Sequence, residues 1–179
     1  MARDWGPNDF STIQSDLGVV ASFSPDVVSL QVGTNELTFL SAFEVGSALE
    51  DLTRLLFESY GVKHICVCQT LYHKGISSLN KLVSILPQYL KIVFEPIPYV
   101  VLWCHRGFWK CKTRFLPHVG IHLNNLGQYS FFRSLRGTIL TCLKNLTLDL
   151  EAVLCSQDNY KFLSFCLFPL FEGYNIIPL

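Results

Sequence analysis

Charge is scarce in this chain, and neither sign is in excess. Only 16% of the 179 residues are charged, and 14 Lys and Arg balance 14 Asp and Glu. A net charge of zero provides no general electrostatic attraction to nucleic acid or to an anionic membrane, so neither is an expected partner. Half of the residues are apolar, which is enough for a core and argues against disorder of the whole chain. The length suits one domain.

Long hydrophobic runs are also lacking. No segment reaches the ~18 uninterrupted apolar residues of a membrane helix, and the best candidate, residues 162–171, contains Ser164 and Pro169. Residues 1–7 are not followed by the apolar stretch of a signal peptide. The seven Cys are an odd number without such a signal, so we expect reduced thiols in a cytoplasmic or otherwise intracellular protein.

Three apolar, β-branched runs predict buried parallel strands, at residues 26–33, 64–70 and 99–104. Helical spacing of apolar residues lies before, between and after them. The predicted helices cover residues 13–23, 47–60, 78–89 and 128–143. This alternation predicts an α/β fold with a mainly parallel sheet and right-handed crossovers.

Local signals set the expected ends of two helices. Ser47 and Glu50 have the spacing of a capping box, and Gly61 suits the position after the last helical turn. Pro87 is expected to kink or end the third helix. Residues 146–179 have no clean period, so we predict a domain over residues 1–145 followed by a tail outside it.

Polar residues follow the first predicted strand as Gly33-Thr34-Asn35-Glu36. Open α/β sheets bind ligands beyond the carboxyl ends of their strands. The Asn35 amide is a neutral donor there and suits a developing oxyanion. The alternative is a turn in which Asn35 bonds its own backbone.

A second candidate is His122, in the loop before the last predicted helix. A neutral imidazole is a natural general base near pH 7. The alternative is a loop His that bonds local backbone.

Both segments resemble blocks of the SGNH (GDSL-type) hydrolases. Residues 25–37 are similar to the third block of that family, and residues 120–127 to the last. The resemblance covers residues 10–143 and implies a three-layer α/β/α, flavodoxin-like domain that hydrolyses esters by acyl transfer. It assigns Asn35 to the oxyanion hole, Gly33 to the turn that positions it, and His122 to general base catalysis.

The chain departs from the family pattern at two points. Val119 stands three residues before His122, where the family has the Asp that orients the His. No Gly-Asp-Ser block is present, so no nucleophile is assigned. We therefore expect a degenerate domain without its first strands, a pseudoenzyme whose ligand, if any, is a small ester or acyl compound. The alternatives are a non-catalytic binding or interaction module and a retroelement-derived remnant.

Loss of the first strands would affect the sheet. The family strand order is 2-1-3-4-5, so strand 27–33 would become an edge. An apolar edge with few charges pairs readily with another chain, which predicts self-association unless residues 146–179 cover it.

Three weaker patterns remain. Cys104, His105 and Cys111 match no strong zinc spacing, so neither a metal nor a cofactor is expected. Cys66 and Cys68 alternate along a strand, and we expect both to be buried on one face. Aromatic and basic residues interleave over residues 99–114. They favour a loop over the site with charges in water, and single-stranded nucleic acid is the alternative.

Overall fold

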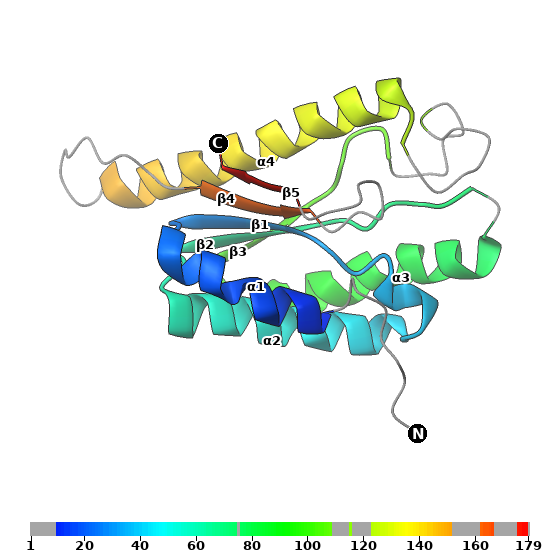
Figure 1. Ribbon diagram of the computed structural model, residues 1–179, viewed down its shortest axis with the longest axis horizontal. Helices are drawn as coiled ribbons and strands as arrows, with labels where there is room; N and C mark the ends of the chain where they lie inside the picture. The colour runs from blue at the N-terminus through cyan, green and yellow to red at the C-terminus, as the bar shows by residue number, and fades with distance from the viewer. Residues whose placement is uncertain are drawn as a thin grey trace.

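The computed structural model describes residues 10–74, 76–108, 115, 123–151, 162–166 and 175–178. These residues form a five-stranded sheet of order β3-β2-β1-β4-β5, with helices on both of its faces. Helices α1, α2 and α3 lie on one face and α4 on the other (Figure 1). The elements are α1 Phe10–Phe23, β1 Val27–Gln31, the 3-10 helix η1 Glu36–Thr38, α2 Ala42–Tyr60, β2 His64–Cys68, α3 Ser77–Phe94, β3 Val100–Trp103, α4 Asn125–Glu151, β4 Phe162–Cys166 and β5 Asn175–Pro178. The predicted α/β class is confirmed.

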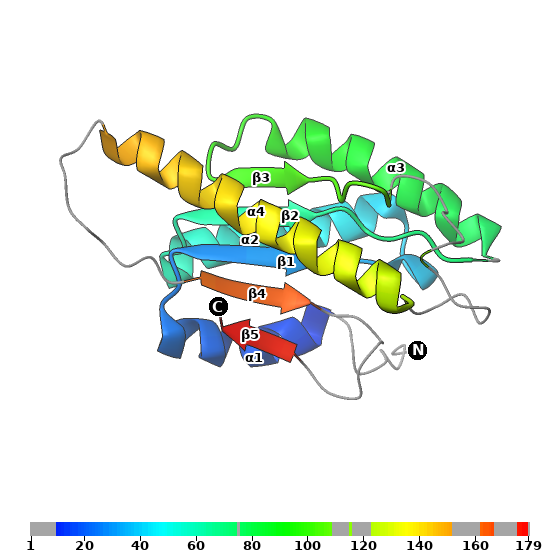
Figure 2. The same ribbon diagram turned by 90° about the horizontal axis from the view of Figure 1, so that it is seen from above.

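The three predicted strands are parallel neighbours, with β1 between β2 and β4 and with β3 on the far side of β2. Every residue of β1 and β2 is buried, as expected for strands that are covered on both faces. Their carboxyl ends point the same way, so the residues that follow them gather at one edge of the sheet (Figure 2). This edge is the part of the fold that matters for function.

The start of α2 differs from the prediction. Its capping box is formed by Ser41 and Glu44, not by Ser47 and Glu50: the Ser41 hydroxyl accepts from the Glu44 N–H, and the Ser41 N–H donates to the Glu44 carboxylate at 2.8 Å. Glu50 instead pairs with Arg54 at 2.7 Å on the helix surface. The earlier start buries an additional helical turn. The predicted end is confirmed, because Gly61 adopts a left-handed φ of 67°.

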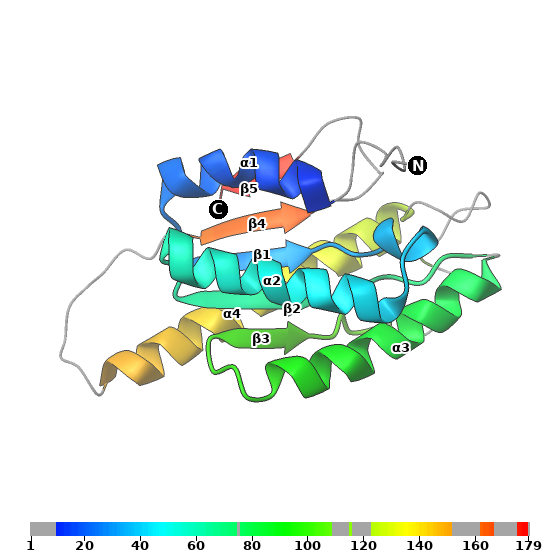
Figure 3. The same ribbon diagram turned by 90° about the horizontal axis from the view of Figure 1, so that it is seen from below.

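Pro87 does not end α3, which continues to Phe94. The helix continues because the residues beyond the proline bury apolar side chains. Leu90 and Phe94 both lie in the core. That burial outweighs the loss of one helical hydrogen bond at the proline. Figure 3 shows α3 and α2 side by side on the same face of the sheet.

The edge expected at β1 is covered. β4 pairs with β1 in parallel over its full length, from Val27 opposite Phe162 to Gln31 opposite Cys166. β5 then pairs with β4 in antiparallel fashion. The expectation of an exposed edge at residues 27–33 is therefore wrong, and the alternative, cover by the segment 146–179, is confirmed. A fully buried strand needs hydrogen-bond partners on both sides, and β4 provides the second set. Self-association through this edge loses its basis.

Two apolar cores flank the sheet. The larger lies between β1–β3 and helices α1, α2 and α3, and the smaller lies under α4. Cys66, Cys68 and Cys142 belong to the second core, so the prediction that Cys66 and Cys68 share one buried face is confirmed. In the part of the chain that the structure describes, no helix is both long enough and apolar enough to cross a bilayer.

Two helical glycines provide a test of the packing between α2 and α3. A Cβ at Gly46 in α2 would overlap the ring of Tyr89, whereas a Cβ at Gly18 in α1 meets nothing within 4 Å. Gly46→Ala is expected to lower the free energy of unfolding by about 1–3 kcal/mol, because the ring must move. Gly18→Ala is expected to raise it by about 0.5–1 kcal/mol through helix propensity alone. Urea unfolding followed by circular dichroism measures both, and an equal gain in the two variants would contradict this packing.

Candidate functional site

The turn after β1 requires glycine. Gly33 has a φ of +100°, a conformation that other L-residues rarely adopt. Its surroundings leave little space, since a Cβ would lie 3.1 Å from Val45 and 3.4 Å from Thr70. The turn directs the chain from the sheet edge into η1. Gly33 therefore allows the chain to turn sharply here, where another residue would be strained.

Asn35 stands at the first residue before η1 and is half-buried. Its side chain makes no capping hydrogen bond to that helix. The backbone carbonyl of Asn35 accepts instead from the Thr38 hydroxyl at 2.6 Å and from the Thr38 N–H at 3.0 Å. The alternative prediction was a turn closed by the Asn35 side chain. In the structure the backbone carbonyl of Asn35, and not its side chain, makes the local hydrogen bonds. The amide NH₂ remains a donor at the carboxyl edge of the sheet.

His122 and Val119 lie outside the described residues, but the second half of their block is described. The Asn124 side chain accepts from the Gly127 N–H at 2.9 Å and caps the start of α4. The Asn124 N–H donates to the Phe115 carbonyl at 2.9 Å. A Cβ at Gly127 would lie only 2.6 Å from that carbonyl oxygen. Residues 123–127 therefore form the start of α4, and Phe115 packs against that start.

A buried polar network that the sequence did not predict lies at the same edge. His105 is fully buried, two residues after the end of β3. Its Nε2 is 2.5 Å from Gln31 Oε1, and its Nδ1 is 2.9 Å from Ser134 Oγ on α4. Gln31 uses its amide nitrogen to donate to the Gln69 carbonyl at 3.0 Å. Gln31 Oε1 is then the acceptor, which assigns the hydrogen to Nε2 of His105 and makes Nδ1 of the neutral ring an acceptor.

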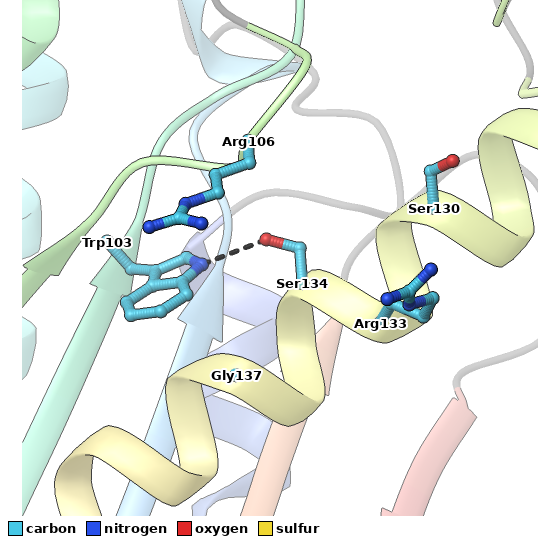
Figure 4. Close-up of a pocket in the computed structure, with 6 residues that line it drawn as sticks. All are labelled: Trp103, Arg106, Ser130, Arg133, Ser134 and Gly137. Carbon is cyan, nitrogen blue, oxygen red and sulfur yellow. Dashed lines mark hydrogen bonds between the residues drawn. The ribbon is translucent and has the colours of Figure 1, made fainter.

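Trp103 completes this network. Its indole Nε1 donates to Ser134 Oγ at 3.0 Å (Figure 4). The Ser134 hydroxyl can then donate to His105, so one directional chain of hydrogen bonds links β3, α4 and β1. Every polar side chain in it has a partner, as buried polar groups require. The only sequence signal for it was an amide inside an apolar strand at Gln31.

Buried thiols lie next to this network. The Ser29 hydroxyl is 3.4 Å from the Cys68 sulfur. A hydrogen bond from the Cys66 thiol lowers the pKa of Cys68, against the effect of its burial. Burial raises the pKa of Cys66. Both are free thiols in the core. Within the described ranges, no group of three or more His, Cys, Asp or Glu is placed to hold a metal ion.

Two pockets lie beside β3. One, of about 390 Å³, is open between the end of β3 and α4 and is lined by Trp103, Arg106, Ser130, Arg133, Ser134 and Gly137 (Figure 4). The other, of about 400 Å³, lies toward α3 and has a largely apolar lining that includes Leu86, Leu90 and Leu102. Thr70 also lines the second pocket, next to the Gly33 turn.

No model of a known protein family matches the chain, and no curated protein matches it.

Proposed function

We propose that the chain is an esterase-like domain of the SGNH hydrolase type that binds a small ester or acyl ligand at the carboxyl edge of its sheet, without efficient turnover. The observation that carries the proposal is the Asn35 amide. It follows β1 at the Gly33 turn, and the adjacent helix does not use it as a cap. An amide donor at this place is suited to the carbonyl oxygen of an ester.

The arrangement of the strands supports the proposal. In the resemblance, β1, β2 and β3 correspond to strands 3, 4 and 5 of the family, and the observed sheet has them as parallel neighbours in that order. The family places its first strand beside the third, and here the parallel β4 takes that place. β5, which is antiparallel, departs from the flavodoxin-like pattern.

The chain has residues suited to binding an ester but lacks the residues that turnover requires. Asn35 would donate to the carbonyl oxygen, and His122 would take a proton. Val119 cannot accept a hydrogen bond from the imidazole, and in a Ser-His-Asp enzyme the loss of the Asp costs about 10⁴ in turnover. The 179 residues contain no Gly-Asp-Ser to supply the attacking hydroxyl. A ligand site without acyl transfer follows.

Ligand binding tests this proposal directly. Saturation-transfer NMR with ethyl butyrate is expected to show saturable binding to the wild type and a loss of about tenfold in Asn35→Asp, which keeps the shape of the side chain but replaces a donor with an acceptor. Asn125→Asp makes the same change from amide to carboxylate at an exposed position of α4, so it is the matched control and is expected to bind like the wild type. Equal binding by all three proteins, or none by the wild type, would contradict the assignment of Asn35.

A further inference from the structure

The neutral chain separates its charges along the sequence. No Asp or Glu occurs between Glu95 and Asp149, although seven basic residues do. These seven are Arg106, Lys110, Lys112, Arg114, Arg133, Arg136 and Lys144. The net charge of the whole chain is zero, but this part of it is positively charged. It includes the end of β3 and the first half of α4. An anion that approaches it meets a local excess of positive charge.

Two of these arginines line the pocket between β3 and α4. Arg106 follows β3, and Arg133 lies on α4 (Figure 4). Ser130, Arg133, Ser134 and Gly137 have the spacing of one stripe along a helix, so they present a single surface to the pocket. Figure 4 shows the Arg106 guanidinium beside the Trp103 indole and the Ser134 hydroxyl directed at the indole nitrogen.

Neither arginine has a carboxylate partner in the part of the chain that the structure describes. Among the described residues, the Lys and Arg ion pairs join Arg54 to Glu50 and Asp51, and Lys63 to Asp26. Arg133 lies 5.8 Å from the centre of the Tyr129 ring, which is a contact with a π face and not with an anion. Two guanidinium groups that line one pocket raise the positive potential there. Among the residues that the structure describes, no carboxylate is paired with the charge of these two guanidinium groups.

We propose that this pocket binds the phosphate group of a phosphate monoester. Arg106 and Arg133 would each present a fork of N–H donors, and the Ser130 hydroxyl would add another. A carboxylate has two oxygens, whereas a phosphate monoester has three terminal oxygens and up to two negative charges, which matches two guanidinium groups. The site is separate from the ester site proposed above and does not depend on it.

The walls of the pocket are held in place by the buried network. Ser134 Oγ accepts from Trp103 and contacts His105, so its hydrogen bonds are already used in the protein. Gly137 has no side chain, and a Cβ there would lie 3.1 Å from the indole. Trp103 can therefore lie against α4 and form a fixed floor. Ligand contacts are left to Arg106, Arg133 and Ser130.

Calorimetric titration of the full chain tests the proposal. The probes are inorganic phosphate, glycerol 3-phosphate, and an oligothymidylate with and without a 5′-phosphate. Binding of glycerol 3-phosphate is expected to weaken about tenfold or more in Arg106→Gln and in Arg133→Gln. Arg136→Gln is the control, because Arg136 is exposed on the same helix but does not line the pocket, and it is expected to bind like the wild type.

The outcomes separate the possible sources of the phosphate. Binding of glycerol 3-phosphate by the wild type, lost in both pocket variants, supports a small phosphomonoester. Binding that is confined to the oligonucleotide with the 5′-phosphate, and is lost in the same variants, supports the end of a nucleic-acid strand. No binding of any phosphate probe, or an equal loss in Arg136→Gln, would overturn the proposal. The substituted arginines are exposed, so unchanged thermal unfolding is expected and verifies that the variants fold.

Discussion

His105→Ala is expected to lower the free energy of unfolding by about 3–5 kcal/mol, since it leaves a cavity in the core and removes two buried hydrogen bonds at once. Gln31 Oε1 would lose its donor, and the Ser134 hydroxyl would lose its acceptor. Gln31 is buried, so its amide oxygen could not recover a partner from bulk water without local opening. A domain with a typical stability of about 5–15 kcal/mol would then be close to unfolding.

Two serines on α4 provide a milder test of the same network. Ser134→Ala removes the shared partner of Trp103 and His105 and is expected to cost about 1–3 kcal/mol. Ser130→Ala, one helical turn away and outside the network, is expected to change stability by less than about 0.5 kcal/mol. Urea unfolding measures all three variants. Equal, small effects of the two serine substitutions would show that the network does not stabilise the fold.

Ser164→Pro is expected to lower the free energy of unfolding by about 2–4 kcal/mol and to promote self-association. β4 lies between β1 and β5, so its backbone is paired on both sides and proline removes a ladder hydrogen bond whichever way the N–H points. Loss of β4 would leave β1 as an uncharged edge strand that can pair with another chain. Chemical denaturation measures the stability, and size-exclusion chromatography with light scattering measures the association.

Ser164→Thr is the matched control for this prediction. Threonine favours strands and keeps the backbone N–H, so this variant is expected to remain as stable and as monodisperse as the wild type. If Ser164→Pro behaved like Ser164→Thr, β4 would not be a necessary partner of β1.

The sequence predicted the parallel strands well because their signal is local. β1, β2 and β3 are mostly apolar runs, and the structure only trims their predicted ends. The start of α2 was predicted wrongly for a different reason. Ser41 with Glu44 and Ser47 with Glu50 have the same capping-box spacing. Only the packed fold distinguishes them, because the earlier start places Ala42 and Val45 in the core.

The remaining misses arise from contacts between distant residues. β4 and β5 are too short to show a period, and pairing with β1 and with each other stabilises them. His105 lies 74 residues from Gln31, and it was considered only as a weak zinc ligand. The position of Asn35 was predictable, since a strand end and a glycine turn define it. The Asn35 side chain makes no capping hydrogen bond to η1. This depends on the geometry of η1, which a sequence pattern does not determine.

Ester hydrolysis by the purified chain tests the central claim most directly. The rates of hydrolysis of p-nitrophenyl acetate and p-nitrophenyl butyrate are measured for the wild type and for His122→Ala, followed by mass spectrometry after treatment with a fluorophosphonate. Equal, background rates are expected in both proteins, with no labelled serine. Turnover by the wild type that is lost in His122→Ala, together with a labelled serine, would contradict this expectation, because the chain would then contain a nucleophile and an active triad.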